Sequence, residues 1–318
     1  MKVLVVSNMY PGRNPDFEYA GIFVKEQCDS LNKIKEIDCE LDGIDGFKAK
    51  YHYLVGSFAV LFKVLFGNYD VVRAHYGLSA LFTLLIPFKK WKNVVLTLHG
   101  GDILSDQGKS IQVFLTKRIV KKVGHVITLN EAMNLVVSKL RKDYIVLPCG
   151  VDDKLFMPNK IDLRKNVVLF PGRKSRVVKN YSLFEKIIKA YNDKYEKLTP
   201  IILDGFDRHE VKDLMCSSSV ILMTSISEGS PQAIKEAMCC DMAILSSNVG
   251  DVSDVIGSTP GTGVFDLNSS PEKIASRLND IIKDARKTEG ARRRRIIDLQ
   301  LTNDSITSKL INIYKEVS

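Results

Sequence analysis

Residues Val220–Ser246 read VILMTSISEGSPQAIKEAMCCDMAILS. The apolar run Val220–Thr224 predicts a buried strand, residues 231–239 have helical periodicity, and Ala243–Ser246 predicts a second strand. Two apolar strands joined through a helix form a right-handed crossover between parallel strands of one sheet. This segment therefore predicts a parallel α/β sheet.

The same alternation of apolar runs and helical periodicity extends through both halves of the chain. In the first half the expected strands are Val3–Ser7, Cys39–Ile44, Val71–Ala74, Val94–Leu98, Val126–Leu129 and Ile145–Leu147, and the expected helices cover 21–34, 51–66, 78–86, 110–122 and 131–141. In the second half we expect further strands at Val167–Phe170 and Ile201–Leu203 and helices at 180–195, Glu210–Ser217 and about 300–316. Continuous Val, Ile and Leu runs of this kind are typical of strands that helices cover on both faces.

A polar stretch, Gly150–Asn166, interrupts this pattern and indicates a boundary near residue 155. We predict an α/β fold of two Rossmann-like, doubly wound parallel-sheet domains, residues 1–155 and 156–299, that face each other across a cleft. A final helix within 300–318 belongs to either domain and could pack back on the first. Because open parallel sheets bind ligands beyond the carboxyl ends of their strands, this arrangement suits an enzyme that joins two substrates.

The composition is that of a soluble globular protein, with 318 residues of which 45% are hydrophobic and 26% are charged. The longest apolar stretch, Leu54–Phe66, contains Lys63 and is shorter than the roughly 20 residues of a membrane-spanning helix. The opening MKVLVVSN is too short for a signal peptide. We therefore expect a cytoplasmic protein. The six cysteines have no C-x-x-C spacing, so we expect neither disulfides nor a metal site.

The formal charge of +9 is concentrated in one region, because residues 47–122 contain 12 Lys and Arg against 3 Asp and Glu. A basic region attracts phosphate groups of nucleic acid, anionic lipid or a substrate. It can also be an ordinary solvated surface.

Two glutamates mark the segment after the strand Val220–Thr224. Glu228 ends the loop, Ser230 is expected to cap the next helix, Pro231 suits its first turn, and Glu236 lies more than one turn inside it. With eight positions and a loop between them, the two carboxylates cannot share a helix face. They can contact opposite ends of one ligand lying across the helix start, where backbone amides favour a phosphate.

A second polar loop follows the strand Val167–Phe170. Its sequence, PGRKSRVVKN from Pro171 to Asn180, places Arg173 and Lys179 after a turn at Gly172. A guanidinium and an ammonium in such a loop can hold a diphosphate without a metal ion. The alternative for each cation is a solvated surface side chain.

At these residues the chain resembles the retaining glycosyltransferases of the GT-B fold, specifically family four, which includes enzymes of bacterial teichuronic-acid-type and capsular polysaccharides. The resemblance covers most of the chain. It rests on the Glu228 and Glu236 pair, the Gly172–Asn180 loop, and the segments LPCGVDDKLFMPN at 147–159, TLHGGDI at 97–103 and SNMYPGRNPDFEYAGIFVKEQ at 7–27. Departures from the family pattern include Pro231 where glycine is common and Cys149 where asparagine is usual.

The resemblance implies a role for each residue of the motifs. Glu236 would hold the ribose of the nucleotide, Glu228 would bond a hydroxyl of the transferred sugar, and Arg173 and Lys179 would neutralise the leaving diphosphate. The remaining donor-binding positions are Gly21, Gly172, Gly229 and Ser230. His99 would contact the sugar from the acceptor domain, and His75 and Asp102 are weaker acceptor-side candidates; a strand-end histidine or a turn-capping aspartate can equally be structural.

The expected activity is metal-independent, retaining transfer of a sugar from a nucleotide-sugar, UDP-sugar in preference to GDP-sugar, to a glycan or lipid-linked acceptor, with no cofactor. Two alternatives remain. One is a subunit of the same fold that binds nucleotide-sugars without turnover. The other is a nucleic-acid-binding protein using the basic region, although no recognised nucleic-acid motif is present and we expect no nucleic-acid partner.

The stretch Tyr51–Phe66, YHYLVGSFAVLFKVLF, has apolar residues close to helical spacing, with Lys48, Lys50 and Lys63 in or beside it. Further along the same domain follow Lys89, Lys90, Trp91 and Lys92. A basic helix with aromatic side chains can lie in the headgroup layer of an anionic membrane, which would make the protein peripheral at the inner face. The alternative is that the apolar face of this helix packs on the parallel sheet.

Overall fold

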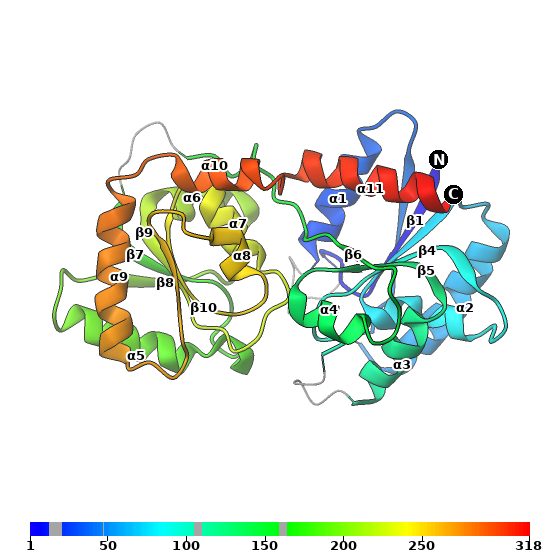
Figure 1. Cartoon of the computed structure of the whole chain (residues 1–318), viewed down its shortest axis with the longest axis horizontal. Coiled ribbons are helices and arrows are strands. Elements are labelled where there is room, and N and C mark those ends of the chain that lie inside the picture. Colours follow the sequence, from blue (N-terminus) through cyan, green and yellow to red (C-terminus); the bar gives the residue numbers. More distant parts are fainter. Residues whose placement is uncertain (13–20, 47, 105–109, 159–163) are drawn as a thin grey trace. The chain divides into compact units, whose positions relative to one another are not determined.

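The computed structural model describes residues 1–12, 21–46, 48–104, 110–158 and 164–318, which divide into two compact units (Figure 1). The first unit consists of Met1–Gly150 and Asn303–Ser318, and the second of Val151–Thr302. The chain thus leaves the first unit at Gly150 and returns to it for the C-terminal helix.

The first unit is built on a six-stranded parallel sheet with the order β2-β1-β3-β4-β5-β6. Its strands are β1 (Lys2–Ser7), β2 (Asp38–Gly43), β3 (Val71–His75), β4 (Trp91–Thr97), β5 (Val123–Thr128) and β6 (Ile145–Val146). The central strands β1 and β3 are almost completely buried because helices cover both faces of the sheet. The predicted strands of this half are therefore confirmed.

The helical elements of this unit are α1 (Ile22–Asn32), α2 (Tyr51–Phe66), η1 (Gly77–Leu84), α3 (Ser110–Val120), α4 (Glu131–Val137) and α11 (Asn303–Val317). Helices α2 and α3 pack against η1. Helix α11 packs against α1 (Figure 1). The helix expected at 78–86 is instead a 3₁₀ segment, interrupted by non-helical backbone at Ala80.

Helix α11 joins the first unit through buried polar groups as well as apolar packing. Tyr314 is fully buried, and its hydroxyl accepts a hydrogen bond of 3.3 Å from the Arg73 guanidinium on β3. Arg73 also donates to the Thr97 hydroxyl at the end of β4. The last helix is therefore attached to the middle of the first sheet.

The second unit contains a five-stranded parallel sheet with the order β11-β10-β9-β7-β8. The strands are β7 (Lys165–Phe170), β8 (Thr199–Ile202), β9 (Ser218–Met223), β10 (Ala243–Ser247) and β11 (Thr262–Phe265). Together the two sheets confirm the prediction of two parallel-sheet α/β domains. Strand β11 was not predicted, because it is only four residues long and contains Gly263.

The helices of the second unit are η3 (Val177–Lys179), α5 (Tyr181–Asn192), α6 (Arg208–Ser217), α7 (Gln232–Cys239), α8 (Val252–Ile256), α9 (Pro271–Ala285) and α10 (Ala291–Asp298). Helices α8, α9 and α10 were not predicted from the sequence. For α9 the start signal was present, since Ser270 caps the helix through the Lys273 amide and Pro271 occupies its first turn.

The arginine run Arg292–Arg295 in α10 is a structural feature. Arg292 is fully buried, and its guanidinium contacts the Asp241 carboxylate at 3.0 Å and the carbonyls of Pro260 and Thr288. Arg293 donates to the carbonyls of Asp153 and Phe156. These bonds satisfy carbonyls of neighbouring segments, so much of this positive charge is engaged within the second unit.

Candidate active site

Two loops meet at the carboxyl edge of the second sheet, where the neighbouring strands β7 and β9 end. The Ile226 amide donates to the Val178 carbonyl at 2.8 Å, and the Thr224 hydroxyl donates to the carbonyls of Lys179 and Asn180 at 3.0 Å. The loop after β7 and the loop after β9 are therefore joined by one backbone bond and by the Thr224 hydroxyl, which brings the two predicted polar segments together.

Lys179 and Glu228 form an ion pair across these two loops. The distance between Lys179 Nζ and Glu228 Oε1 is 2.7 Å, and the side chains are only 12% and 18% exposed. The Ser225 hydroxyl donates to the same carboxylate oxygen at 2.8 Å. Because both charges have lost most of their water, each depends on the other for compensation.

Gly172 is required by the path of the Lys179 side chain. Its backbone has φ 134°, and a Cβ placed there would lie 3.0 Å from Lys179 Cε. A side chain at position 172 would displace the lysine stem that carries the ammonium to Glu228. Next to it, Arg173 Nε lies 2.7 Å from Asp204 Oδ1, beyond the end of the adjacent strand β8. Two of the four cations in this loop, Arg173 and Lys179, therefore each lie beside a carboxylate.

Glu236 is 4% exposed on α7 and is held by a cation of its own. Its Oε1 accepts a hydrogen bond of 2.5 Å from Arg208 at the first position of α6, and the guanidinium of Arg208 lies 4.6 Å from the centre of the Phe156 ring. Arg208 was not singled out from the sequence. The capping box formed by Asp207 and Glu210 marks this helix start and was the available signal.

Ser230 does not cap α7, contrary to the prediction. The helix begins at Gln232, and Pro231 occupies the N-cap position without a side-chain cap. Because Pro231 has extended backbone (φ −68°, ψ 114°), Ser230 lies one residue outside the cap. Gly229 lies close to Gly250 in the loop after β10. A Cβ on Gly250 would come within 2.6 Å of the Gly229 carbonyl oxygen.

The Ser230 hydroxyl instead connects a buried charge pair that the sequence analysis missed. Lys235, which has no exposed surface, donates to Ser230 Oγ at 2.5 Å, and Ser230 Oγ donates to Asp251 Oδ2 at 2.5 Å. Lys235 Nζ lies 3.8 Å from the same carboxylate oxygen. Burial raises the pKa of Asp251, and the Lys235 charge opposes this shift. A lysine on the inner face of a helix therefore attaches the loop that carries Glu228 to α7.

In the first unit, two histidines meet at the carboxyl edge of the sheet. His75 ends β3 and His99 follows the neighbouring strand β4; His75 Nδ1 and His99 Nε2 are 3.2 Å apart. Phe23 on α1 lies 5.3 Å from the His99 ring. Gly21 precedes α1 in a left-handed conformation (φ 78°), where a Cβ would lie 2.4 Å from the Met9 carbonyl oxygen. The fold thus brings the start of α1 beside both histidines.

Both histidines are neutral near pH 7. Burial and the charge of Arg73 lower the pKa of His99 to about 3, and burial together with Arg73 and His99 lowers the pKa of His75 well below its usual value. A neutral imidazole can both donate and accept a hydrogen bond. His99, the member of the pair that is not fully buried, is therefore suited to an uncharged hydroxyl group rather than to an anion.

Asp102 bonds to the backbone near both histidines and positions the loop of His99. The carboxylate accepts a 3.0 Å hydrogen bond from the His99 amide and a 2.9 Å bond from the Gly77 amide. Burial raises the pKa of Asp102 to about 6, against the effect of these bonds. Because its side chain has no exposed surface, Asp102 acts through the loop of His99 and not by direct contact with a ligand.

Comparison with known proteins identifies the family. A family model described as glycosyl transferases group 1 matches residues 106–298, more than half of the chain. The protein therefore belongs to the group 1 glycosyl transferase family, of GT-B type.

Among curated proteins, the chain is 25% identical over 215 residues to the putative teichuronic acid biosynthesis glycosyltransferase TuaC of Bacillus subtilis strain 168. The match covers 59% of this chain and 55% of that protein, so the chain spans about half the length of this relative.

Solved structures with the same fold include sucrose-phosphate synthase from Thermosynechococcus elongatus, with a TM-score of 0.80 at 15% identity over 99% of both chains. Anabaena HepE in complex with UDP-glucose has a TM-score of 0.72 at 16% identity, over 99% of this chain and all of that chain. These likenesses establish the fold.

We predict that Lys235→Met lowers the free energy of unfolding by about 3–5 kcal/mol, because it leaves the Asp251 carboxylate buried without its cation. Combining it with Asp251→Asn should recover part of the loss. Chemical denaturation measures both, and the exposed Lys186→Met on α5 should stay within about 0.5 kcal/mol of the parent. A single variant as stable as the parent would disprove a stabilising role of the pair.

We predict that the neutral state of His99 makes the unfolding free energy pH-dependent. Its folded pKa of about 3 lies below the ordinary 6.5, so its contribution is complete above pH 6.5 and is lost as the pH falls toward 3. Relative to His99→Gln, the parent should lose about 2 kcal/mol between about pH 7 and pH 5. Denaturant titrations at several pH values test this; parallel pH profiles would show that the folded pKa is not depressed.

Proposed function

We propose that the protein transfers a sugar, with retention of anomeric configuration, from a nucleotide-sugar bound by the second unit to an acceptor bound by the first. The observation that carries the proposal is the set of charged groups at the carboxyl edge of the second sheet. Two cations, Arg173 and Lys179, lie in one loop, and two carboxylates, Glu228 and Glu236, flank the start of α7. A diphosphate ester with a sugar at each end offers complementary groups to this set.

The nucleotide end is assigned to Glu236. Its carboxylate has about four acceptor positions, so Oε1 can remain bonded to Arg208 while the group also accepts ribose hydroxyls. Arg208 holds the carboxylate in place, and Phe156 supports the guanidinium. UDP-sugars are the favoured donors. The structure of Anabaena HepE with UDP-glucose, a protein of the same fold, supports this choice.

The diphosphate is assigned to Arg173 and Lys179. Each of these cations pairs with a carboxylate, and an arriving diphosphate would share or replace Asp204 and Glu228 as the counter-charge. Negative charge grows on the diphosphate as the bond to the sugar breaks. Fixed cations at that position stabilise the transition state, which is usually the largest catalytic contribution. On this proposal the enzyme needs neither metal nor cofactor.

Glu228 is assigned to a hydroxyl of the transferred sugar. Its Oε1 already accepts from Lys179 and Ser225, an arrangement that orients the group and lowers its reactivity as a nucleophile. In the step we propose, the bond from the sugar's anomeric carbon to the phosphate oxygen breaks. The acceptor oxygen bonds to the same face of that carbon, and its proton passes to the departing phosphate.

The acceptor is assigned to the edge of the first sheet that bears His75 and His99. Neutral imidazoles next to an aromatic ring suit sugar hydroxyls, and Phe23 supplies such a ring. We propose a glycan or lipid-linked glycan of a bacterial surface polysaccharide as the acceptor, used at the cytoplasmic face of the membrane. The similarity to TuaC, which is named for teichuronic acid biosynthesis, supports this class.

We predict that Glu236→Ala weakens binding of UDP by about 1.5–3 kcal/mol, because hydrogen bonds to a charged partner are lost. Isothermal titration with UDP, and with GDP to identify the base, measures the effect. The exposed Glu185→Ala on α5 is the matched control and should bind as the parent does. Equal affinity of the parent and Glu236→Ala would remove Glu236 from the nucleotide site.

We predict that Arg173→Ala and Lys179→Ala each reduce turnover about 10²–10³-fold, since each removes a charge that stabilises the leaving group. UDP release from UDP-sugars measures turnover, with Lys186→Ala as a control of the same charge change. EDTA should leave the parent activity unchanged. Activity lost in EDTA and restored by manganese would contradict metal independence; UDP-sugar binding without any hydrolysis or transfer would indicate a non-catalytic binding subunit.

A further inference from the structure

Helix α2 presents its largest apolar side chains to solvent. The exposed residues, here called the α2 surface, are Tyr51, Leu54, Val55, Phe58, Phe62, Leu65 and Phe66. Phe62 is 61% exposed and Phe66 is 76% exposed. Their ring centres are 6.2 Å apart in a stacked arrangement. Contiguous apolar exposure of this kind marks an interaction site.

The inward face of α2 explains why these side chains point outward. Ser57 and Val60 are the fully buried residues of the helix, and a Cβ on Gly56 would lie 3.2 Å from Ile44. The helix thus packs on the core of the unit through Val60 and the partly buried Tyr53, Leu61 and Val64, with Gly56 beside Ile44. Rotating it to bury Phe58 and Phe62 would bring large rings into space that accommodates glycine and serine. The alternative that this apolar face packs on the sheet therefore holds for Leu61, whereas Phe58, Phe62 and Phe66 stay exposed.

Positive charge lies at both ends of the α2 surface. Lys48 and Lys50 precede the helix and are exposed, and Lys48 is paired with Asp45 at 2.9 Å. At its other end, Lys2 Nζ donates to the Gly67 carbonyl at 3.2 Å. Lys63, within the helix, forms ion pairs with Glu40 and Asp42 of β2.

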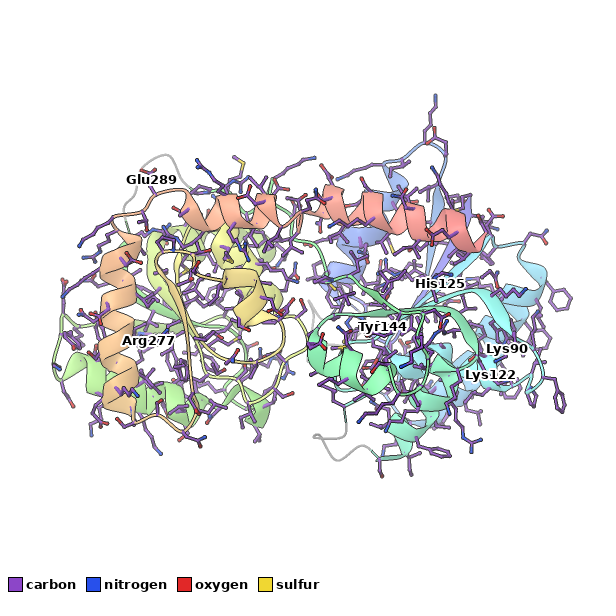
Figure 2. The ribbon with its side chains drawn as sticks, in the orientation of Figure 1. Lys90, Lys122, His125, Tyr144, Arg277 and Glu289 are labelled. Carbon is purple, nitrogen blue, oxygen red and sulfur yellow. The ribbon has the colours of Figure 1, made fainter. Side chains whose placement is uncertain are left out.

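The apolar and basic character continues into the turn before β4. This turn lies near the end of α2, since Asn93 Nδ2 donates to the Tyr69 carbonyl at 3.4 Å. Phe88 in the turn is 99% exposed. Figure 2 shows Lys90 and Lys122 side by side, and the Lys90 ammonium donates to the Lys121 carbonyl at 3.0 Å. Burial and the charge of Lys90 lower the pKa of Lys122, as expected where cations gather.

We propose that the α2 surface docks the first unit on an anionic lipid surface. The helix would lie in the plane of the headgroups, with its phenylalanines at the acyl boundary and the flanking lysines beside lipid phosphates. This combination of apolar side chains and surrounding positive charge favours an anionic bilayer over a protein partner. No helix in the described part of the chain is long and apolar enough to cross a membrane, so the docking is interfacial.

The docking would place the histidine pair near the lipid. Helix α2 is antiparallel to the strands and begins at the carboxyl edge of the first sheet. There the side-chain amide of Asn8, just after β1, donates to the Tyr53 hydroxyl at 2.7 Å. That edge also bears His75 and His99. A lipid-linked acceptor would thus reach the histidines from the surface on which the unit sits. This last step rests on the proposed function, whereas the docking itself does not.

Flotation of the full chain with lipid vesicles tests the docking. Binding to phosphatidylcholine vesicles enriched in phosphatidylglycerol should exceed binding to pure phosphatidylcholine at least tenfold, and it should fall as salt rises. The double variant Phe62→Ser and Phe66→Ser should lose binding at least tenfold, while Ile297→Ser, a half-exposed residue on α10, should not. Reversing the charge of Lys50 and Lys92 to Glu should weaken binding at least tenfold, since each basic residue contributes about fivefold. The same change at Lys186 and Lys273 is the matched control.

Equal binding to both kinds of vesicle, or binding to neither, would overturn the proposal. So would concentration-dependent self-association that disappears in the phenylalanine variant, because the α2 surface would then be an interface between copies. UDP titration of the same variants separates this outcome from failure of the proposed function. The Phe62→Ser and Phe66→Ser variant should bind UDP as the parent does, since the nucleotide site is assigned to the second unit.

Discussion

The ion pair between Lys179 and Glu228 depends on a property of parallel sheets, namely that all strands end at the same edge. Residues 49 positions apart in the sequence meet there because β7 and β9 are neighbours. Both side chains are largely withdrawn from water, so the pair is favourable only while the geometry is maintained. The backbone bonds between the two loops and the Lys235–Ser230–Asp251 network maintain it.

The two sheet edges differ in electrostatic character although they share one architecture. The edge of the second unit concentrates ionised groups, with Arg173 and Lys179 beside carboxylates. The edge of the first unit holds a neutral histidine pair, because burial and the nearby Arg73 oppose a further positive charge. Ionised groups suit a diphosphate, and neutral donors and acceptors suit hydroxyls. The proposed assignment of donor and acceptor to the two units follows from this difference.

The basic side chains of this chain have different roles in different places, and the amino-acid composition alone does not distinguish these roles. The run Arg292–Arg295 is the densest basic segment, yet Arg292 is buried and bonded to Asp241 and to backbone carbonyls. The lysines around α2 are instead at the surface, next to exposed phenylalanines. The first group stabilises the fold, and the second includes the exposed Lys50 and Lys92, to which we assign the proposed lipid contact.

The sequence by itself determined the strands from β1 to β10, the two parallel-sheet domains and the polar loops carrying Arg173, Lys179, Glu228 and Glu236, because each depends on local apolar patterns or short spacings. It missed β11 and α8, which are four and five residues long, and α10, whose apolar periodicity is diluted by charge. It also missed α9, although this helix has a start signal and apolar residues at helical spacing. Only the tertiary structure decided the partners of the buried polar groups. Arg208 pairs with Glu236, Asp251 pairs with Lys235, and Asp102 accepts a hydrogen bond from the His99 amide. It also decided which face of α2 is buried. That helix is apolar almost all round, and only packing of Val60, Leu61 and Val64 against the core of the first unit fixes the orientation of its phenylalanines.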